Sequence, residues 1–193
     1  MDLAVAYQNI ARVIDLQAEE KEIFASLVET VSVNRKKFLL TEGQICKYEY
    51  FVLSGCLRSF YMDKNLIEHT TMFAIEGWWT GNLKSFVKNE PSEFNIEALV
   101  NCKLIQLNKE KLEILYSRVP KFERYFRILL QNRLLATQDR VNSHLSVGAS
   151  EKYEQFRKQY PTIEQGVPLK YIASYLGITP TYLSRIRRKG TRK

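Results

Sequence analysis

The chain has 193 residues, of which 45% are hydrophobic and 26% are charged, a composition ordinary for a globular protein. No apolar run approaches the ~20 residues that a membrane span needs, and the N-terminus carries Asp2 and no Lys or Arg before its apolar residues, unlike a secretory signal. We therefore expect a cytoplasmic protein without a membrane partner, whose net charge of +8 favours a polyanion.

The first part of the chain changes from helical spacing to a pattern of short strands. In residues 3–30 one helical face collects Leu16, Ile23, Phe24, Leu27 and Val28. Six later segments are short and rich in β-branched and aromatic residues: VSVNRKKFLL, EYFVLSG, CLRSFYM, LIEHTTMFAI, FNIEALV and CKLIQLN. Turn residues such as Gly43 and Gly55 separate them, which predicts an antiparallel sandwich, jelly roll or barrel.

The cysteines and histidines show no pattern of a metal site or of an enzyme. Cys46, Cys56 and Cys102 form no CxxC pair, and we expect buried or half-buried thiols in a reducing cytosol. His69 lies in a predicted strand, and neither it nor His144 is accompanied by a nucleophile elbow, a phosphate-binding loop or a metal pair. We therefore expect no catalytic residue, no metal and no enzymatic activity.

Two helices are predicted after the strands. The first begins at Asn108, a suitable N-cap, and ends before Pro120. The second, about Lys121 to Leu145, would be roughly 37 Å long. Its apolar residues form one stripe: Phe122, Phe126, Leu129, Leu130, Leu134, Val141 and Leu145. A rod of this length with one apolar stripe favours pairing with a second copy, and the alternative is an ordinary core helix.

The C-terminal part predicts a helix over about Glu151–Gln159 and then two short helices that meet at Gly177. Glycine accepts the positive φ that ends a helix, and Thr179 followed by Pro180 is a strong signal for the start of the next one. The residues expected to face inward are Ile172, Ala173, Leu176, Leu183 and Ile186. This is the pattern of a helix-turn-helix motif.

The outward residues of the last helix fit a nucleic-acid contact. We expect Thr181 and Arg185 to read bases, because the N-terminal part of a recognition helix meets base edges in the major groove. The other expected contacts are Thr179, Tyr182, Ser184, Arg187, Arg188 and Lys189, with the last three placed on phosphates. The alternative is a helical pair with a solvated basic face.

The charge is distributed unevenly along the chain. Residues 151–193 hold ten basic and three acidic residues, so this segment carries +7 of the net charge of +8. A basic module joined to a nearly neutral one is typical of a polyanion-binding appendage. The charge therefore supports the nucleic-acid interpretation of the helical pair.

Taken together, these motifs resemble the Crp/Fnr family of bacterial transcription regulators over nearly the whole chain. The stretches EGQ, YFVLSGCLR and EGWWTGNL are similar to the family's jelly-roll sensor domain, and VPLKYIASYLGITPTYLSRIRR is similar to its DNA-binding motif. The resemblance implies an α+β fold in three parts. These are a cyclic-nucleotide-binding-like sensor domain at residues 1–119, a dimerisation helix at 120–146 and a helix-turn-helix domain at 147–193. It also implies a homodimer that binds a double-stranded DNA operator, with RNA polymerase as a further partner.

The sequence departs from the family's nucleotide-binding pattern in the sensor segment. Cyclic-nucleotide-binding members carry a Gly-Glu pair for the ribose and, about ten positions later, an Arg for the phosphate. An ungapped comparison places Gly81-Asn82 and Ser92-Glu93 at these positions, so both charged groups are absent and an acidic one is added. We therefore expect no cAMP, and Gly81, Asn82, Leu83, Ser92 and Glu93 would line any pocket for another effector.

Other residues near these positions could either contribute to a ligand pocket or have a purely structural role. Lys84 and Lys88 lie near the altered pairs and could in principle replace the missing Arg. Trp78, Trp79 and Phe86 would either line a pocket or be ordinary core aromatics. The chain also ends at Lys193, where the family continues into a β-hairpin wing, so we expect the wing to be missing.

The leading hypothesis is therefore a dimeric transcription regulator. The alternative is a ligand-sensing signalling module whose C-terminal helices contact a protein partner. A protein partner would not require ten basic residues in this segment, and DNA binding at low salt separates the two.

Overall fold

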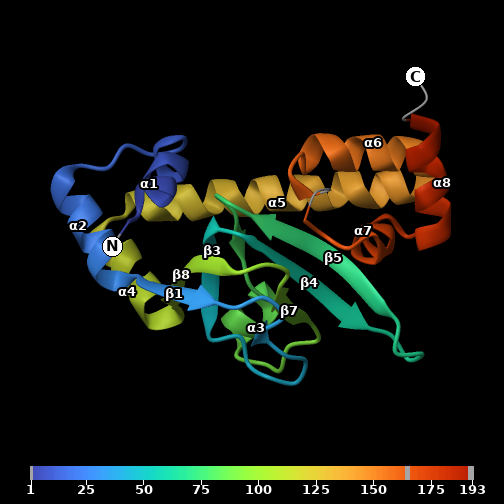
Figure 1. The fold of residues 1–193 in the computed structure, drawn as a ribbon. Helices are drawn as coiled ribbons and strands as arrows, with labels where there is room; N and C mark the ends of the chain where they lie inside the picture. Colours follow the sequence, from blue (N-terminus) through green and yellow to red (C-terminus); the bar gives the residue numbers. More distant parts are fainter. Residues whose placement is uncertain (1, 164–165, 191–193) are drawn as a thin grey trace. The chain divides into compact units, whose positions relative to one another are not determined.

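The fold is a computed structural model, and it describes residues 2–163 and 166–190, without the side chains of His144, Leu145 and Lys189. Eight strands form a β-sandwich (Figure 1): β1 Glu29–Val33, β2 Phe38–Leu40, β3 Tyr48–Ser54, β4 Cys56–Met62, β5 Glu68–Ile75, β6 Trp79–Thr80, β7 Asn95–Ala98 and β8 Cys102–Asn108. The helices are α1 Ala4–Ala11, α2 Ala18–Leu27, α3 Leu83–Lys88, α4 Lys109–Arg118, α5 Lys121–Ser146, α6 Ala149–Gln159, α7 Leu169–Leu176 and α8 Pro180–Gly190. The predicted α+β class is confirmed.

The sandwich consists of two four-stranded sheets. Their strand orders are β1-β8-β3-β6 and β2-β7-β4-β5, and the ladders that β8 forms with β1 and β3 are antiparallel. Gly55 connects β3 and β4 at a φ of +107°. A Cβ atom at this position would lie 2.6 Å from the Cys102 Sγ and 2.9 Å from a backbone oxygen, so only glycine fits.

The N-terminal residues form two helices, whereas the sequence showed one helical pattern over residues 3–30. α1 and α2 are separated by residues 12–17, and Gln17 begins α2 with a capping box that includes Glu20. The strands β1–β5, β7 and β8 occur where short strands were predicted, whereas β6 and α3 lie in a segment without a prediction. The predicted N-cap at Asn108 is confirmed, because its side chain accepts a hydrogen bond from the Lys111 N–H at 2.8 Å.

The contacts divide the chain into two units. The first comprises Met1–Ser59 and Phe73–Asn132, and the second comprises Phe60–Met72 and Arg133–Lys193. The three-part division into residues 1–119, 120–146 and 147–193 stays a prediction.

The first unit has an aromatic core that includes Trp79. The Trp79 ring lies 5.3 Å from Phe51 and 5.2 Å from Phe126, and its Nε1 donates to the Tyr125 hydroxyl at 3.0 Å. That hydroxyl donates to Asn9 Oδ1 at 2.6 Å, which ties α1 to α5. Trp79 is half-buried and packs on these aromatic rings, and Phe86 is buried.

All three cysteines are free and buried, as predicted. Burial raises the pKa of the Cys56 thiol to about 12 and also raises the pKa values of Cys46 and Cys102. These thiols are therefore protonated packing groups near neutral pH.

Candidate nucleic-acid interface

The helical pair α7–α8 is built around the corner that the sequence predicts. Gly177 ends α7 with a φ of +68°, and the Ile178 N–H donates to Ala173 O while the Gly177 N–H donates to Ser174 O. These two hydrogen bonds form a Schellman motif. The Thr179 hydroxyl accepts from the Tyr182 N–H at 3.2 Å, so Thr179 caps α8 with Pro180 at its first position.

The predicted inner and outer faces of the pair are observed. Ile172, Ala173, Leu176 and Leu183 are buried, and Ile186 is half-buried. On the outer face the exposed residues are Thr179, Thr181, Tyr182, Arg185, Arg187 and Arg188, while Ser184 is half-buried. The side chain of Lys189 lies outside the described residues.

The outer face of α8 has the chemistry of a polyanion contact. It carries hydroxyl donors and guanidinium groups, and the α8 sequence PTYLSRIRRKG contains no acidic residue. Arg side chains can bind phosphate or a guanine edge through two parallel hydrogen bonds. Lys170 in the first turn of α7 adds an exposed cation, whose Nζ lies 4.8 Å from the ring centroid of Tyr171. Lys170 is one of the ten basic residues of segment 151–193, but no motif in the sequence marks it as a contact.

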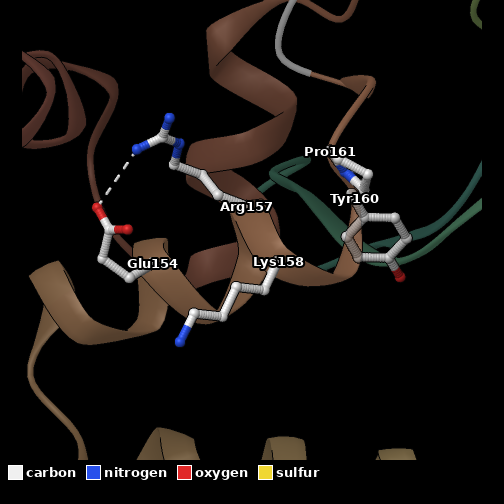
Figure 2. Close-up of a pocket in the computed structure, with 5 residues that line it drawn as sticks. All are labelled: Glu154, Arg157, Lys158, Tyr160 and Pro161. Atoms are coloured by element: carbon white, nitrogen blue, oxygen red, sulfur yellow. Dashed lines mark ion pairs between the residues drawn. The ribbon is translucent and has the colours of Figure 1, made fainter.

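A surface hollow at the end of α6 is separate from this face. Figure 2 shows its lining residues, Glu154, Arg157, Lys158, Tyr160 and Pro161. Arg157 forms an ion pair with Glu154 at 3.6 Å, and the side chains of Arg157 and Lys158 extend in different directions. The polar groups of the hollow therefore do not converge on one point.

Residues 81–93, here called the sensor segment, contain the positions that align with the family's nucleotide-binding pairs. Two of these residues, Asn82 and Ser92, lie close together in the structure. Asn82 and Ser92 are both buried, and Asn82 Nδ2 donates to the Ser92 hydroxyl at 2.8 Å. The Ser92 Oγ also accepts from the Phe94 N–H at 3.0 Å and donates to Phe94 O at 2.9 Å. A serine hydroxyl offers one donor and two acceptor positions, so all of them are used within the chain.

The remaining polar groups of the segment are bonded to their own neighbours as well. Asn82 Oδ1 caps the short helix α3 by accepting from the Ser85 N–H at 3.1 Å. The Ser85 hydroxyl accepts from the Cys46 N–H at 2.8 Å and donates to Glu90 O at 2.5 Å. This network has the geometry of a structural turn.

Charges at the outside of the segment are also paired. Lys84 donates to Glu93 at 2.7 Å between exposed side chains, which lowers the pKa of Glu93 and raises that of Lys84. Lys84 is thus engaged with a carboxylate, and Lys88 is exposed in the last turn of α3.

Glu49 adds a second carboxylate beside the segment. A Cβ atom at Gly81 would lie 2.6 Å from the Glu49 Oε1, so this carboxylate lies against the Gly81 backbone. The segment therefore has no carboxylate at position 82, no cation at position 92 and a carboxylate beside Gly81. These residues do not fit an anionic cyclic nucleotide.

The described residues also show what kinds of site are missing. Among residues 2–163 and 166–190, no group of three or more His, Cys, Asp or Glu side chains could hold a metal ion. No helix in the described part of the chain combines the length and apolarity of a membrane span.

Comparison with known proteins assigns the sandwich to a domain family. Residues 30–119 match the model of the cyclic nucleotide-binding domain. A search of the curated proteins found no match to the sequence.

Solved structures with the same fold include several regulators. The c-di-GMP-responsive global regulator CLP of Xanthomonas campestris is 16% identical, with a TM-score of 0.71 and coverage of 91% of this chain and 92% of that chain. The Thermus thermophilus catabolite activator protein is 19% identical, with a TM-score of 0.59 and coverage of 92% and 84%. A protein of the Crp/Fnr family from Eubacterium rectale is 19% identical, with a TM-score of 0.67 and coverage of 91% and 83%. Residues 30–119 therefore match a cyclic nucleotide-binding domain, and the chain shares its fold with these regulators.

Proposed function

We propose that this protein is a DNA-binding transcription regulator that acts as a dimer and binds a specific operator. The observation that carries the proposal is the outer face of α8, where exposed Thr181, Tyr182, Arg185 and Arg188 follow a fixed helical corner without an acidic neighbour on the helix. The fold shared with CLP and the catabolite activator protein supports it. The proposed division of labour places sensing in residues 1–119, pairing in 120–146 and DNA binding in 147–193.

The dimer is supported by the exposed apolar side of α5. Leu130, Leu134 and Val141 are 43%, 59% and 55% exposed, and Thr137 lies between them at the same spacing. Alternating steps of four, three and four residues place these positions on the seam of a two-stranded coiled coil. Pairing with a second copy would remove this stripe from water.

The sensor segment supports a regulator that does not respond to cAMP. The internal bonds occupy the side chains of Asn82 and Ser92, and the carboxylates of Glu49 and Glu93 disfavour a cyclic phosphate. A different effector would enter elsewhere, or the sandwich would act as a scaffold.

The experiment that tests the proposal is selection of bound sites from random and genomic DNA by the full chain. We expect recovery of a near-palindromic site whose two halves are about one helical turn apart. Binding to this site should weaken steeply with added salt, because each phosphate contact releases counterions. If the protein retains no DNA at low salt, the alternative of a signalling module with a protein partner is favoured instead.

A further inference from the structure

One hydroxyl joins the β4–β5 hairpin to α7 inside the C-terminal unit. The Ser174 Oγ donates to Glu68 O at 2.7 Å and accepts from the Thr70 N–H at 2.9 Å. Both backbone groups belong to β5, which is the last strand in the order β2-β7-β4-β5. An edge strand leaves such groups to water or to another partner, and here a single serine satisfies a donor and an acceptor at once.

Arg140 of α5 makes a second connection from the same strand to the helical pair. Its Nη1 donates to Thr71 O, and its guanidinium carbon lies 4.6 Å from the ring centroid of Tyr175. The Tyr175 ring packs in turn on Phe156 and Tyr160 of the α6 segment, at 5.5 and 5.8 Å. A planar guanidinium can stack on an aromatic face and still donate in its own plane, so Arg140 serves both contacts.

These contacts involve a side of α7 that is separate from the outer face of α8. Thr181, Tyr182, Arg185 and Arg188 are exposed although Ser174 and Arg140 are engaged. α7 and α8 are joined by the Schellman corner at Gly177, so the placement of α7 also fixes α8.

We propose that Ser174 and Arg140 are positioning residues, which hold the α7–α8 pair on the β4–β5 hairpin in the orientation that presents α8 to DNA. We call the contacts of these two residues with Glu68, Thr70 and Thr71 the hairpin contact. This inference rests on the proposed function. A dimer must place two copies of α8 about 34 Å apart to reach both half-sites. A helical pair that is free to turn loses conformational entropy when it binds, and its affinity for DNA is therefore lower.

The existence of the hairpin contact is tested without DNA, through the amide exchange of Thr70. In Ser174→Ala the Thr70 N–H loses its acceptor, and its exchange rate should rise about fivefold or more. Alanine is a better helix former than serine, so α7 is not weakened by this change. The amides of Phe51 and Leu104, which lie in the β3–β8 ladder, should keep the exchange rates of the parent protein. Ser117→Ala, the same change on the exposed side of α4, is the matched control.

The positioning role is tested with the selected operator. Ser174→Ala and Arg140→Met should each weaken binding about three- to tenfold, with Ser117→Ala and Arg118→Met as controls. Because no phosphate contact is lost, the slope of log affinity against log salt should not change. The preference among operator variants should also stay that of the parent.

Each other result overturns the inference. Unchanged Thr70 exchange in Ser174→Ala means that the hairpin contact does not form in solution. Unchanged or tighter operator binding means that it does not position α8, and a salt slope reduced by about one means that the residue binds phosphate itself. A parent protein that binds no DNA contradicts the proposed function, whereas the exchange of Thr70 still decides whether the hairpin contact exists.

Discussion

Asn82 donates its side-chain amide to the Ser92 hydroxyl at 2.8 Å, across the two positions at which nucleotide-binding relatives are expected to hold a carboxylate and a cation. The pair lies in the core of the sensor segment, since Asn82 is 8% and Ser92 is 2% exposed. The two positions are therefore close in space, but they bind each other. The two positions that are expected to bind a ligand in such proteins are joined here by a hydrogen bond between Asn82 and Ser92.

Ser92→Ala should destabilise the fold by about 1–3 kcal/mol. The change leaves the Asn82 amide and the Phe94 N–H buried without their acceptor, which costs more than a neutral surface hydrogen bond. Urea denaturation of Ser92→Ala beside Ser117→Ala, an exposed serine on α4, measures the difference. Equal stability of the two variants would contradict the role of the Ser92 hydroxyl.

Addition of cAMP should leave the thermal stability of the protein unchanged. A ligand present at 100 times its Kd adds about 2.7 kcal/mol, which would raise the Tm by about 5–10 °C for a chain of this size. We expect no shift, because the Ser92 hydroxyl is fully used and Lys84 is paired with Glu93. Thermal denaturation with and without millimolar cAMP decides the matter, and a shift of several degrees would refute the proposal for the sensor.

A buried ion pair in the second sheet gives another prediction. Arg58 of β4, which is 1% exposed, forms an ion pair with Glu97 of β7, with Nη2 and Oε1 2.6 Å apart. Removal of one partner leaves the other charge buried, so Arg58→Met should destabilise the fold by about 3–5 kcal/mol. The double variant Arg58→Met, Glu97→Leu should recover most of that loss. Denaturation of the parent, Arg58→Met, Glu97→Leu and the double variant forms a double-mutant cycle, and additive effects would show that the pair is not coupled.

Features that depend on neighbouring residues, such as helix caps and turns, could be predicted from the sequence, whereas contacts between distant segments could not. Gly177, Thr179 and Asn108 act on backbone groups within five residues, so residue type alone predicts their roles. α3 has only six residues, too few for a visible period, and its cap is the same Asn82 that sequence comparison treated as a ligand position. Family resemblance thus singled out Asn82, but the structure was needed to show that its side chain caps α3.

Contacts between distant segments left no trace in the sequence pattern. Ser174 and Glu68 are 106 positions apart, and a half-exposed serine on a short helix has no feature that points to an edge strand. Arg58 likewise lies in a segment that reads as an ordinary strand, and its pairing with Glu97 depends on the order of the sheet. Strand order and helix placement are set by tertiary packing, which hydrophobic periodicity does not encode.

Charges placed on the exposed stripe of α5 should separate the dimer. Leu134→Arg together with Val141→Arg would bring like charges onto both sides of the seam, and we expect the chain to sediment as a monomer. Asn132→Arg, at an exposed polar position on the opposite side of the same helix, should leave the dimer intact. Analytical ultracentrifugation measures both, and a parent protein that is monomeric at micromolar concentration would contradict pairing through α5.

Replacement of Arg185 by alanine and replacement of Arg188 by alanine should change DNA binding in different ways. Arg185 lies nearer the N-terminal end of α8, so its loss should cost about 1–3 kcal/mol of operator binding and relax the preference for one base. Arg188 lies one turn later, and its loss should weaken binding to all sequences and reduce the salt slope by about one. Arg35→Ala, an exposed arginine of the N-terminal unit, controls for the loss of net charge. Titrations of the operator and its single-base variants at several salt concentrations distinguish the two patterns, and the same pattern for both arginines would show that α8 does not read bases through Arg185.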